Sequence, residues 1–183
     1  MITPVRSDPS DDAEQVTQAL PGEPLRAGEM RDGWVRVHTA YDYAGWLRAA
    51  ALDAEADASW LEPRSPHPLA YAMTLLGAPY LWGGMTERGV DCSGLVHMSF
   101  RASGRLVPRD AAQQEGAGTP VGAADLRCGD LVSYGDADGA DHIAFWLGNG
   151  RILHSTHREG VDGVVEEVEP LELRARRRVS FRL

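Results

Sequence analysis

A helix that begins at a cysteine is predicted by Asp91-Cys92-Ser93-Gly94-Leu95-Val96-His97-Met98-Ser99-Phe100-Arg101-Ala102-Ser103, which precedes Gly104. Asp91 stands at the N-cap position, where a carboxylate accepts hydrogen bonds from the first turn. Cys92 then faces the positive end of the helix dipole and unbonded N–H groups, which favour a thiolate and lower its pKa. Burial as a small apolar residue is the alternative for this cysteine. One face of the helix gathers Leu95, Val96, Ser99, Phe100 and Ser103.

Strands follow the helices in the second half of the chain. A shorter helix is predicted over residues 69–76, before the helix breakers Gly77 and Pro79. From Gly129 onward, the pattern changes to strands with turn residues between them. Two helices followed by consecutive strands predict an α+β domain with an antiparallel sheet. The expected strands are residues 130–135, 142–148, 151–156, 163–169 and 178–183.

The first sixty residues predict a separate, small β-barrel. Three strand-like pieces, at 22–30, 33–39 and 43–49, are separated by glycine-containing turns. A unit this short has a marginal core, so we expect it to pack against its neighbour. The prolines of residues 63–68 favour extended backbone between the two units. The predicted organisation is a barrel over residues 1–60, a linker over 61–68 and a larger domain over 69–183.

Charge and composition exclude several functions. The 183 residues carry 27 acidic and 18 basic side chains, and every basic one is arginine, for a net charge of −9. This balance argues against a nonspecific nucleic-acid binder. No membrane span of about 18 apolar residues is present, and residues 1–14 lack the apolar segment of a secretion signal, so we expect a cytoplasmic protein. Two cysteines, Cys92 and Cys128, are too few to staple a disulfide-rich domain.

A nucleophilic cysteine needs a base, and His142 and His154 lie on consecutive predicted strands. A three-residue loop at 148–150 makes them diagonal neighbours on one face, whereas a two-residue turn places His157 opposite His142. The Asn-Gly pair favours the shorter turn and the flanking glycines suit the longer one, so both registers stay open, with His154 preferred. The result is a relay of thiol, imidazole base and orienting group. A metal site of Cys92 and the two histidines lacks the usual short-range ligand pairs.

Two aromatic residues precede the cysteine, within the loop of residues 79–84. Tyr80 and Trp82 are placed to line a cleft, and the phenol of Tyr80 is a candidate donor to an oxyanion. Ordinary packing of the loop is the alternative. Ser93 does not belong to a G-x-S-x-G elbow, which argues against a serine hydrolase.

Taken together, these segments resemble the NlpC/P60 cysteine peptidases in their order and spacing. The resemblance rests on residues 79–84, 91–96, 129–132, 141–144 and 152–155. It implies a papain-like α+β fold, with the cysteine at a helix start against an antiparallel sheet. It also implies that Cys92 is the nucleophile, His142 the base and His154 the orienting residue, with Tyr80 near the oxyanion and no metal or organic cofactor.

The first sixty residues resemble a bacterial SH3 module through residues 22–25, 32–37 and 42–47. The pairing resembles γ-D-glutamyl-diamino-acid endopeptidases, which recycle cell-wall peptides. In that subgroup, the SH3 module closes the cleft and selects peptides with a free N-terminal L-alanine. An ammonium group requires carboxylates and neutral acceptors. The matching positions in this sequence are Glu14, Tyr43, Asp91 and Ser93, with Trp82 as a further substrate-binding candidate.

The expected function is therefore hydrolysis of the γ-D-glutamyl–diamino acid bond in peptidoglycan-derived peptides, with neither nucleic acid nor membrane as partner. Two alternatives stay open at this point. One is a noncatalytic wall-binding protein, because a peptidase fold can decay into a binding surface. The other is a general cell-wall endopeptidase or amidase that uses the same relay, because fold alone does not fix the substrate.

Overall fold

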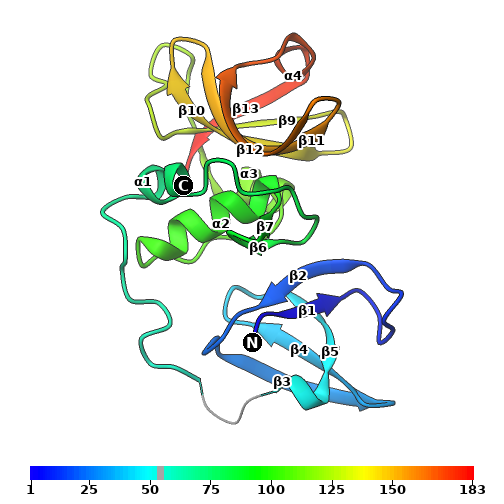
Figure 1. The fold of residues 1–183 in the computed structure, drawn as a ribbon. Helices are drawn as coiled ribbons and strands as arrows, with labels where there is room; N and C mark the ends of the chain where they lie inside the picture. The colour runs from blue at the N-terminus through cyan, green and yellow to red at the C-terminus, as the bar shows by residue number, and fades with distance from the viewer. Residues whose placement is uncertain (53–55) are drawn as a thin grey trace.

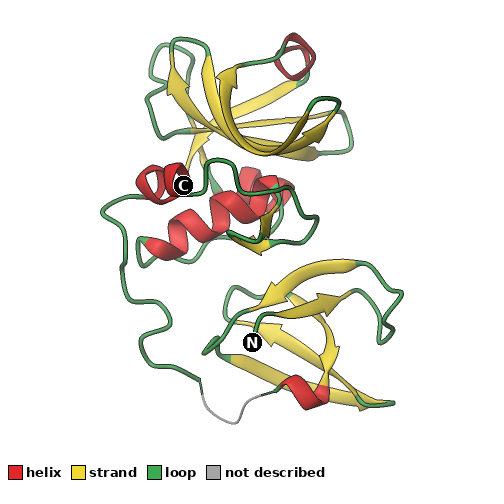
Figure 2. Cartoon of the chain, viewed as in Figure 1, coloured by secondary structure: helices red, strands yellow, loops and turns green. Residues whose placement is uncertain are grey.

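Two β-sheets enclose a central group of helices (Figures 1 and 2). The computed structural model describes residues 1–52 and 56–183. Residues 53–55 belong to the predicted first domain and lie outside the described residues. In Figure 1 the N-terminal sheet, blue to cyan, lies below the green helix α2 (Cys92–Ala102), and the C-terminal sheet lies above it. The predicted α+β class with antiparallel sheets is confirmed.

The N-terminal sheet has five antiparallel strands in the order β2-β1-β5-β4-β3. The three predicted strands correspond to β3, β4 and β5, whereas β1 and β2 were not predicted. A small apolar cluster that includes Val5, Val37 and Leu47 fills its interior. The strands are β1 (Thr3–Arg6), β2 (Gln15–Ala19), β3 (Leu25–Arg31), β4 (Trp34–Thr39) and β5 (Ala44–Arg48), followed by the 3-10 turn η1 (Ala49–Ala51).

The C-terminal sheet has six strands in the order β12-β11-β10-β9-β13-β8. All five strands predicted for this half are confirmed, and only the two-residue strand β8 was not predicted. Their inward-facing side chains include Ile143, Phe145 and Leu153, which pack in the same apolar core as α2. The strands are β8 (Thr119–Pro120), β9 (Leu131–Gly135), β10 (Ala140–Gly148), β11 (Arg151–Arg158), β12 (Val161–Val168) and β13 (Arg177–Arg182).

The central helix α2 begins at Cys92, as predicted, and every one of its residues is buried. Asp91 is its N-cap, and its Oδ1 accepts a hydrogen bond from the N–H of Gly94 at 2.6 Å. No helix in residues 1–52 and 56–183 combines the length and the apolar character that crossing a bilayer requires. Between the two sheets lie α1 (Pro68–Thr74), β6 (Met85–Thr86), β7 (Gly89–Val90) and α3 (Ala111–Ala117) as well. The last helix, α4 (Leu171–Ala175), connects β12 to β13.

A buried arginine joins the two halves of the molecule. The side chain of Arg109 is only 1% exposed, and its guanidinium forms a two-pronged pair with the carboxylate of Asp91, at 3.0 and 2.7 Å. Its Nε donates across the domain boundary to the Oγ1 of Thr17, on β2, at 3.1 Å. It also donates to the hydroxyl of Ser93 at 2.8 Å. One planar cation therefore ties the start of α2 to the N-terminal sheet.

Replacing Arg109 with methionine should lower the free energy of unfolding by about 3–5 kcal/mol, because the carboxylate of Asp91 is then buried without its partner. Urea denaturation followed by circular dichroism measures this loss. Arg31→Ala is the matched control, since Arg31 pairs with Glu29 at the surface and should cost less than about 1 kcal/mol. A loss below 1 kcal/mol for Arg109→Met would contradict the assigned role.

Candidate active site

Cys92 lies where α2 meets the C-terminal sheet. It is the first residue of the helix, and its side chain is 7% exposed. The backbone N–H groups of Ser93, on the helix, and of Ile143, on β10, lie near enough to its sulfur to lower the pKa of the thiol. His142 is the residue that precedes Ile143 on the same strand. The sulfur is therefore held between the helix start and the strand that carries the predicted base.

The hairpin between β10 and β11 settles which histidine meets His142. The turn has two residues, Asn149 and Gly150, both with positive φ, as the Asn-Gly pair favours. A bulge between Trp146 and Gly148 then shifts the register, so that Phe145 lies opposite Leu153. The turn is therefore the two-residue one, but the bulge restores the strand register that the three-residue loop would give, in which His142 and His154 are diagonal neighbours.

This register brings His142 and His154 into contact. The Nε2 of His142 lies 2.7 Å from the Nδ1 of His154, and the two rings meet edge to face. His154 is fully buried, and its Nε2 lies 2.8 Å from the Oε1 of Glu167, on β12. His157 is exposed and pairs with Asp162 instead. His142 keeps one ring nitrogen, Nδ1, for a proton from elsewhere.

Tyr80 and Trp82 border the same region from the loop before α2. Tyr80 is half-buried and stacks on His157, with ring centroids 5.9 Å apart. Burial and the neighbouring Asp91 carboxylate raise the pKa of its phenol, so the hydroxyl keeps its proton at neutral pH and can donate a hydrogen bond. Trp82 is 58% exposed, and its Nε1 donates to the Oε1 of Glu14 at 2.7 Å.

A cleft of about 340 Å³ opens at Cys92, between the two domains. Four carboxylates line it, from Glu14, Asp91, Asp110 and Asp141, and no arginine is among the lining residues described. The hydroxyl of Tyr43 donates to the Oδ1 of Asp110 at 3.2 Å, across the domain boundary. Six of the nine predicted site residues line this cleft, namely Glu14, Tyr43, Trp82, Asp91, Cys92 and Ser93.

The carboxylate of Asp91 is already occupied by donors from its own surroundings. Besides Arg109, it accepts hydrogen bonds from the N–H groups of Gly83, at 2.8 Å, and Gly94. Ser93 donates to the same carboxylate at 3.3 Å and accepts from Arg109. Asp91 and Ser93 therefore organise the wall of the cleft, and the freer acceptors at this end are Glu14 and Asp110.

Comparison with known proteins identifies the fold that carries this geometry. The NlpC/P60 family model matches residues 77–173. The chain belongs to the NlpC/P60 family. A second model, described as the bacterial dipeptidyl-peptidase Sh3 domain, matches residues 5–52, which form the N-terminal sheet.

Curated relatives match about half of this chain. A γ-D-glutamyl-L-lysine dipeptidyl-peptidase of Bacillus subtilis is 45% identical over 83 residues, which are 44% of this chain and 28% of that protein. A probable endopeptidase of Corynebacterium glutamicum is 34% identical over 110 residues, which are 58% of this chain and 51% of that protein. The chain thus spans between about a quarter and a half of the length of these relatives.

Solved structures share the fold of this chain over different lengths. An NlpC/P60 family protein from Bacillus cereus superposes with a TM-score of 0.59 at 22% identity, over 99% of this chain and 60% of that one. The peptidoglycan hydrolase RipB from Mycobacterium tuberculosis superposes with a TM-score of 0.55 at 31% identity, over 63% of this chain and 62% of that one.

In the NlpC/P60 domain, the resting thiol is protonated. Burial and, to a smaller extent, the Asp91 carboxylate together raise the pKa of Cys92 to about 12, against the N–H groups of Ile143 and Ser93, which lower it. The expectation that the helix N-terminus holds Cys92 as a thiolate is therefore wrong for the resting site. Removing the sulfur from water outweighs the stabilisation that these N–H groups provide.

The two histidines are neutral as well. Burial, together with the neighbouring His154 and Arg176, lowers the pKa of His142 to about 3. Burial also lowers the pKa of His154, against the opposing effect of Glu167. A neutral imidazole can accept the proton of a neutral thiol as the sulfur attacks. The arrangement thus suits general-base catalysis by His142 rather than a preformed ion pair.

Three residues of the site were not predicted from the sequence: Arg109, Asp110 and Glu167. Asp110 directly precedes α3 and is its N-cap, so the Pro108-Arg109-Asp110 segment carried a helix-start signal. Glu167 shares a sheet face with His154 because β11 and β12 pair with His154 opposite Val165. Only the pairing register, and not the sequence of β12 itself, shows that contact.

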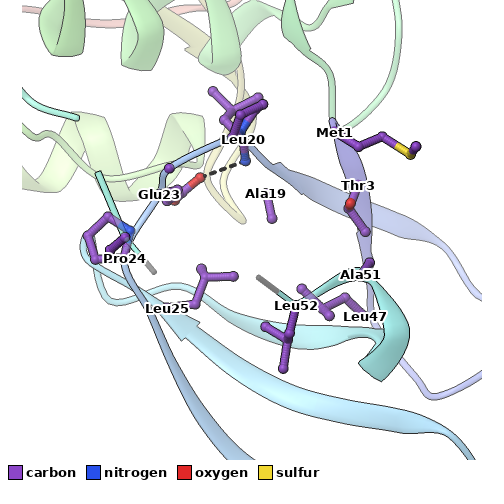
Figure 3. Close-up of a pocket in the computed structure, with 13 residues that line it drawn as sticks. Met1, Thr3, Ala19, Leu20, Glu23, Pro24, Leu25, Leu47, Ala51 and Leu52 are labelled. Atoms are coloured by element: carbon purple, nitrogen blue, oxygen red, sulfur yellow. Dashed lines mark hydrogen bonds between the residues drawn. The ribbon is translucent and has the colours of Figure 1, made fainter. Parts of the chain in front are cut away.

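A second cavity lies apart from these residues, in the N-terminal domain (Figure 3). It measures about 220 Å³ and is lined mainly by apolar side chains, including Leu20, Leu25 and Leu52. None of the nine predicted site residues is among the described residues that line it. Within the described part of the chain, no three His, Cys, Asp or Glu side chains are grouped as metal ligands.

Alkylation of Cys92 by iodoacetamide should accelerate about tenfold for each pH unit between pH 6 and 9, because the thiolate fraction rises in that proportion below a raised pKa. The experiment needs a Cys128→Ser background, since Cys128 is exposed. The Cys92→Ala/Cys128→Ser protein gives the blank rate. A rate that is already constant between pH 6 and 8 would show a preformed thiolate and contradict the neutral resting pair.

Proposed function

We propose that the protein is a cysteine peptidase that hydrolyses the γ-D-glutamyl–diamino acid bond of peptidoglycan peptides with a free N-terminal L-alanine. The observation that carries the proposal is the acidic end of the cleft beside Cys92, formed by Glu14 from the N-terminal domain and Asp110 from the NlpC/P60 domain. Two relatives named γ-D-glutamyl-L-lysine dipeptidyl-peptidase support the same bond. A short peptide with a terminal ammonium group near a γ-D-glutamyl bond matches both the acidic end of the cleft and the bond named for these relatives.

The reaction begins with transfer of the Cys92 proton to Nδ1 of His142 while the sulfur attacks the γ-carbonyl carbon. The new S–C bond gives a tetrahedral oxyanion, for which Tyr80 and the N–H of Cys92 are the proposed donors. The C–N bond then breaks, and His142 gives its proton to the leaving amine. Water, deprotonated by the same imidazole, hydrolyses the thioester and regenerates the thiol.

The terminal ammonium group of the peptide is assigned to the carboxylates of Glu14 and Asp110 and the phenol oxygen of Tyr43. Glu14 is exposed and is fixed by the indole of Trp82, while Asp110 is fixed by Tyr43. Burial raises the pKa of Asp110, which means that its charged form lacks full solvation. A bound ammonium group would supply that missing stabilisation through charge-assisted hydrogen bonds.

Purified protein should release the dipeptide L-Ala-D-Glu from L-Ala-γ-D-Glu-L-Lys or from its diaminopimelate counterpart, as measured by liquid chromatography with mass detection. Cys92→Ala should release none, because the nucleophile is missing. Peptide binding without release by the wild-type protein would favour the wall-binding alternative. Equal release by both proteins would overturn the assignment of Cys92.

Asp110→Asn should lower kcat/KM for the free peptide by about 10–100-fold, because a hydrogen bond to a charged group contributes about 1.5–3 kcal/mol. The same change should have little effect on the N-acetylated peptide, which the wild-type protein should itself cleave slowly. Asp138→Asn, in an exposed loop, serves as the matched control. Equal cleavage of free and acetylated peptides by the wild-type protein would instead indicate a general cell-wall endopeptidase.

A further inference from the structure

The hydrogen bonds that begin with His142 and His154 extend to a third side chain, Glu167 on β12. Glu167 lies diagonally across from His154, which faces Val165 in the β11–β12 pairing. Its Oε1 lies 2.8 Å from the Nε2 of His154, and its Oε2 accepts a hydrogen bond from Nη2 of Arg158. Glu167 is 23% exposed, whereas His154 is completely enclosed. A chain of four side chains, from His142 through His154 and Glu167 to Arg158, thus runs to the edge of the sheet.

The chemistry of the last two members fixes the direction of every hydrogen bond in this chain. An arginine only donates and an ionised carboxylate only accepts. The Arg158 side chain helps to keep Glu167 ionised, because it lowers the pKa of that carboxyl together with His154, against burial. His154 must therefore donate through Nε2, which leaves its Nδ1 as an acceptor. That acceptor in turn requires His142 to carry its proton on Nε2.

We propose that Glu167, oriented by Arg158, is a positioning residue that sets the tautomers of His154 and His142 in series. The result is an unprotonated Nδ1 on His142, which is the nitrogen left to accept the Cys92 proton. The inference rests on the proposed function in one respect only, that His142 is the base. A pair of neutral imidazoles alone has no preferred direction, because either ring can donate to the other.

Glutamine at position 167 reverses the chain while Arg158 is present. Arg158 then holds the amide oxygen, so the amide nitrogen faces His154 and donates to its Nε2. His154 must donate to His142 through Nδ1, and the proton of His142 moves to its own Nδ1. Removing the guanidinium frees the amide to turn over, so its oxygen can again accept from His154. Adding Arg158→Met should therefore restore the unprotonated Nδ1 of His142 that Glu167→Gln removes.

The kinetic test compares release of L-Ala-D-Glu by four proteins. Glu167→Gln should lower kcat at least about 100-fold with little change in KM, because general-base catalysis contributes about 10²–10⁴. Adding Arg158→Met to that variant should recover at least about tenfold, although two changes in one hydrogen-bonded network normally cost more than one. Glu166→Gln is the matched control with wild-type activity, since Glu166 is the adjacent residue and pairs with Arg151.

The spectroscopic test observes the tautomers directly, by ¹⁵N NMR of histidine-labelled protein. The wild-type protein should show His142 protonated on Nε2, and Glu167→Gln should show it protonated on Nδ1. A merely structural ion pair would lose stability in Glu167→Gln without moving that proton. Unchanged tautomers, or no recovery with Arg158→Met, overturn the inference. Failure of the wild-type protein to cleave the peptide would overturn the proposed function instead, and the NMR result stands independently of it.

Discussion

The buried contact between Arg109 and Asp91 organises the molecule around one point. Removing two charges from water costs several kcal/mol for each ion, and this cost is offset only when every donor and acceptor is satisfied. Here the carboxylate caps α2 and the guanidinium reaches Thr17 in the other domain. The same pair therefore sets the position of Cys92 along its helix and the position of the N-terminal sheet over the cleft. Because this ion pair holds the two domains together, residues of both domains line the cleft.

The electrostatic consequence is that Cys92 and His142 are both neutral. Asp91 places a negative charge beside the sulfur, and the closed surroundings remove the water that would solvate a thiolate, so the pKa of Cys92 is raised. The same burial lowers the pKa of His142. A site built this way holds its proton until a substrate carbonyl is present to receive the sulfur. In the proposed mechanism, His142 can accept the Cys92 proton only when its Nδ1 is unprotonated. Glu167 and Arg158, at the edge of the sheet, are proposed to fix that tautomer.

Local signals in the sequence predicted the local parts of this site. The helix at Cys92 was predictable because Asp91 caps it through its own side chain, three residues from Gly94. The hairpin was only half predictable: Asn149 and Gly150 specify the two-residue turn, but the bulge that restores the contact of His142 with its partner arises from pairing across the sheet. Three features could not be predicted because they depend on segments far apart in the chain. They are the burial of the Cys92 sulfur, the contact of Glu167 with His154 and the contact of Arg109 with Thr17. The strands β1 and β2 gave no usable pattern, because Thr3–Arg6 contains a proline and Gln15–Ala19 is mostly polar.

A crystal structure of the Cys92→Ala protein with bound L-Ala-γ-D-Glu-diaminopimelate tests the central claim most directly, that the two domains form one site for an N-terminal amine beside the nucleophile. The account predicts the ammonium nitrogen within about 3 Å of carboxylate oxygens of Glu14 and Asp110. It also predicts the γ-carbonyl carbon over residue 92, on the side of His142. A peptide whose amine points into solvent, or whose γ-carbonyl lies away from residue 92, would contradict the account.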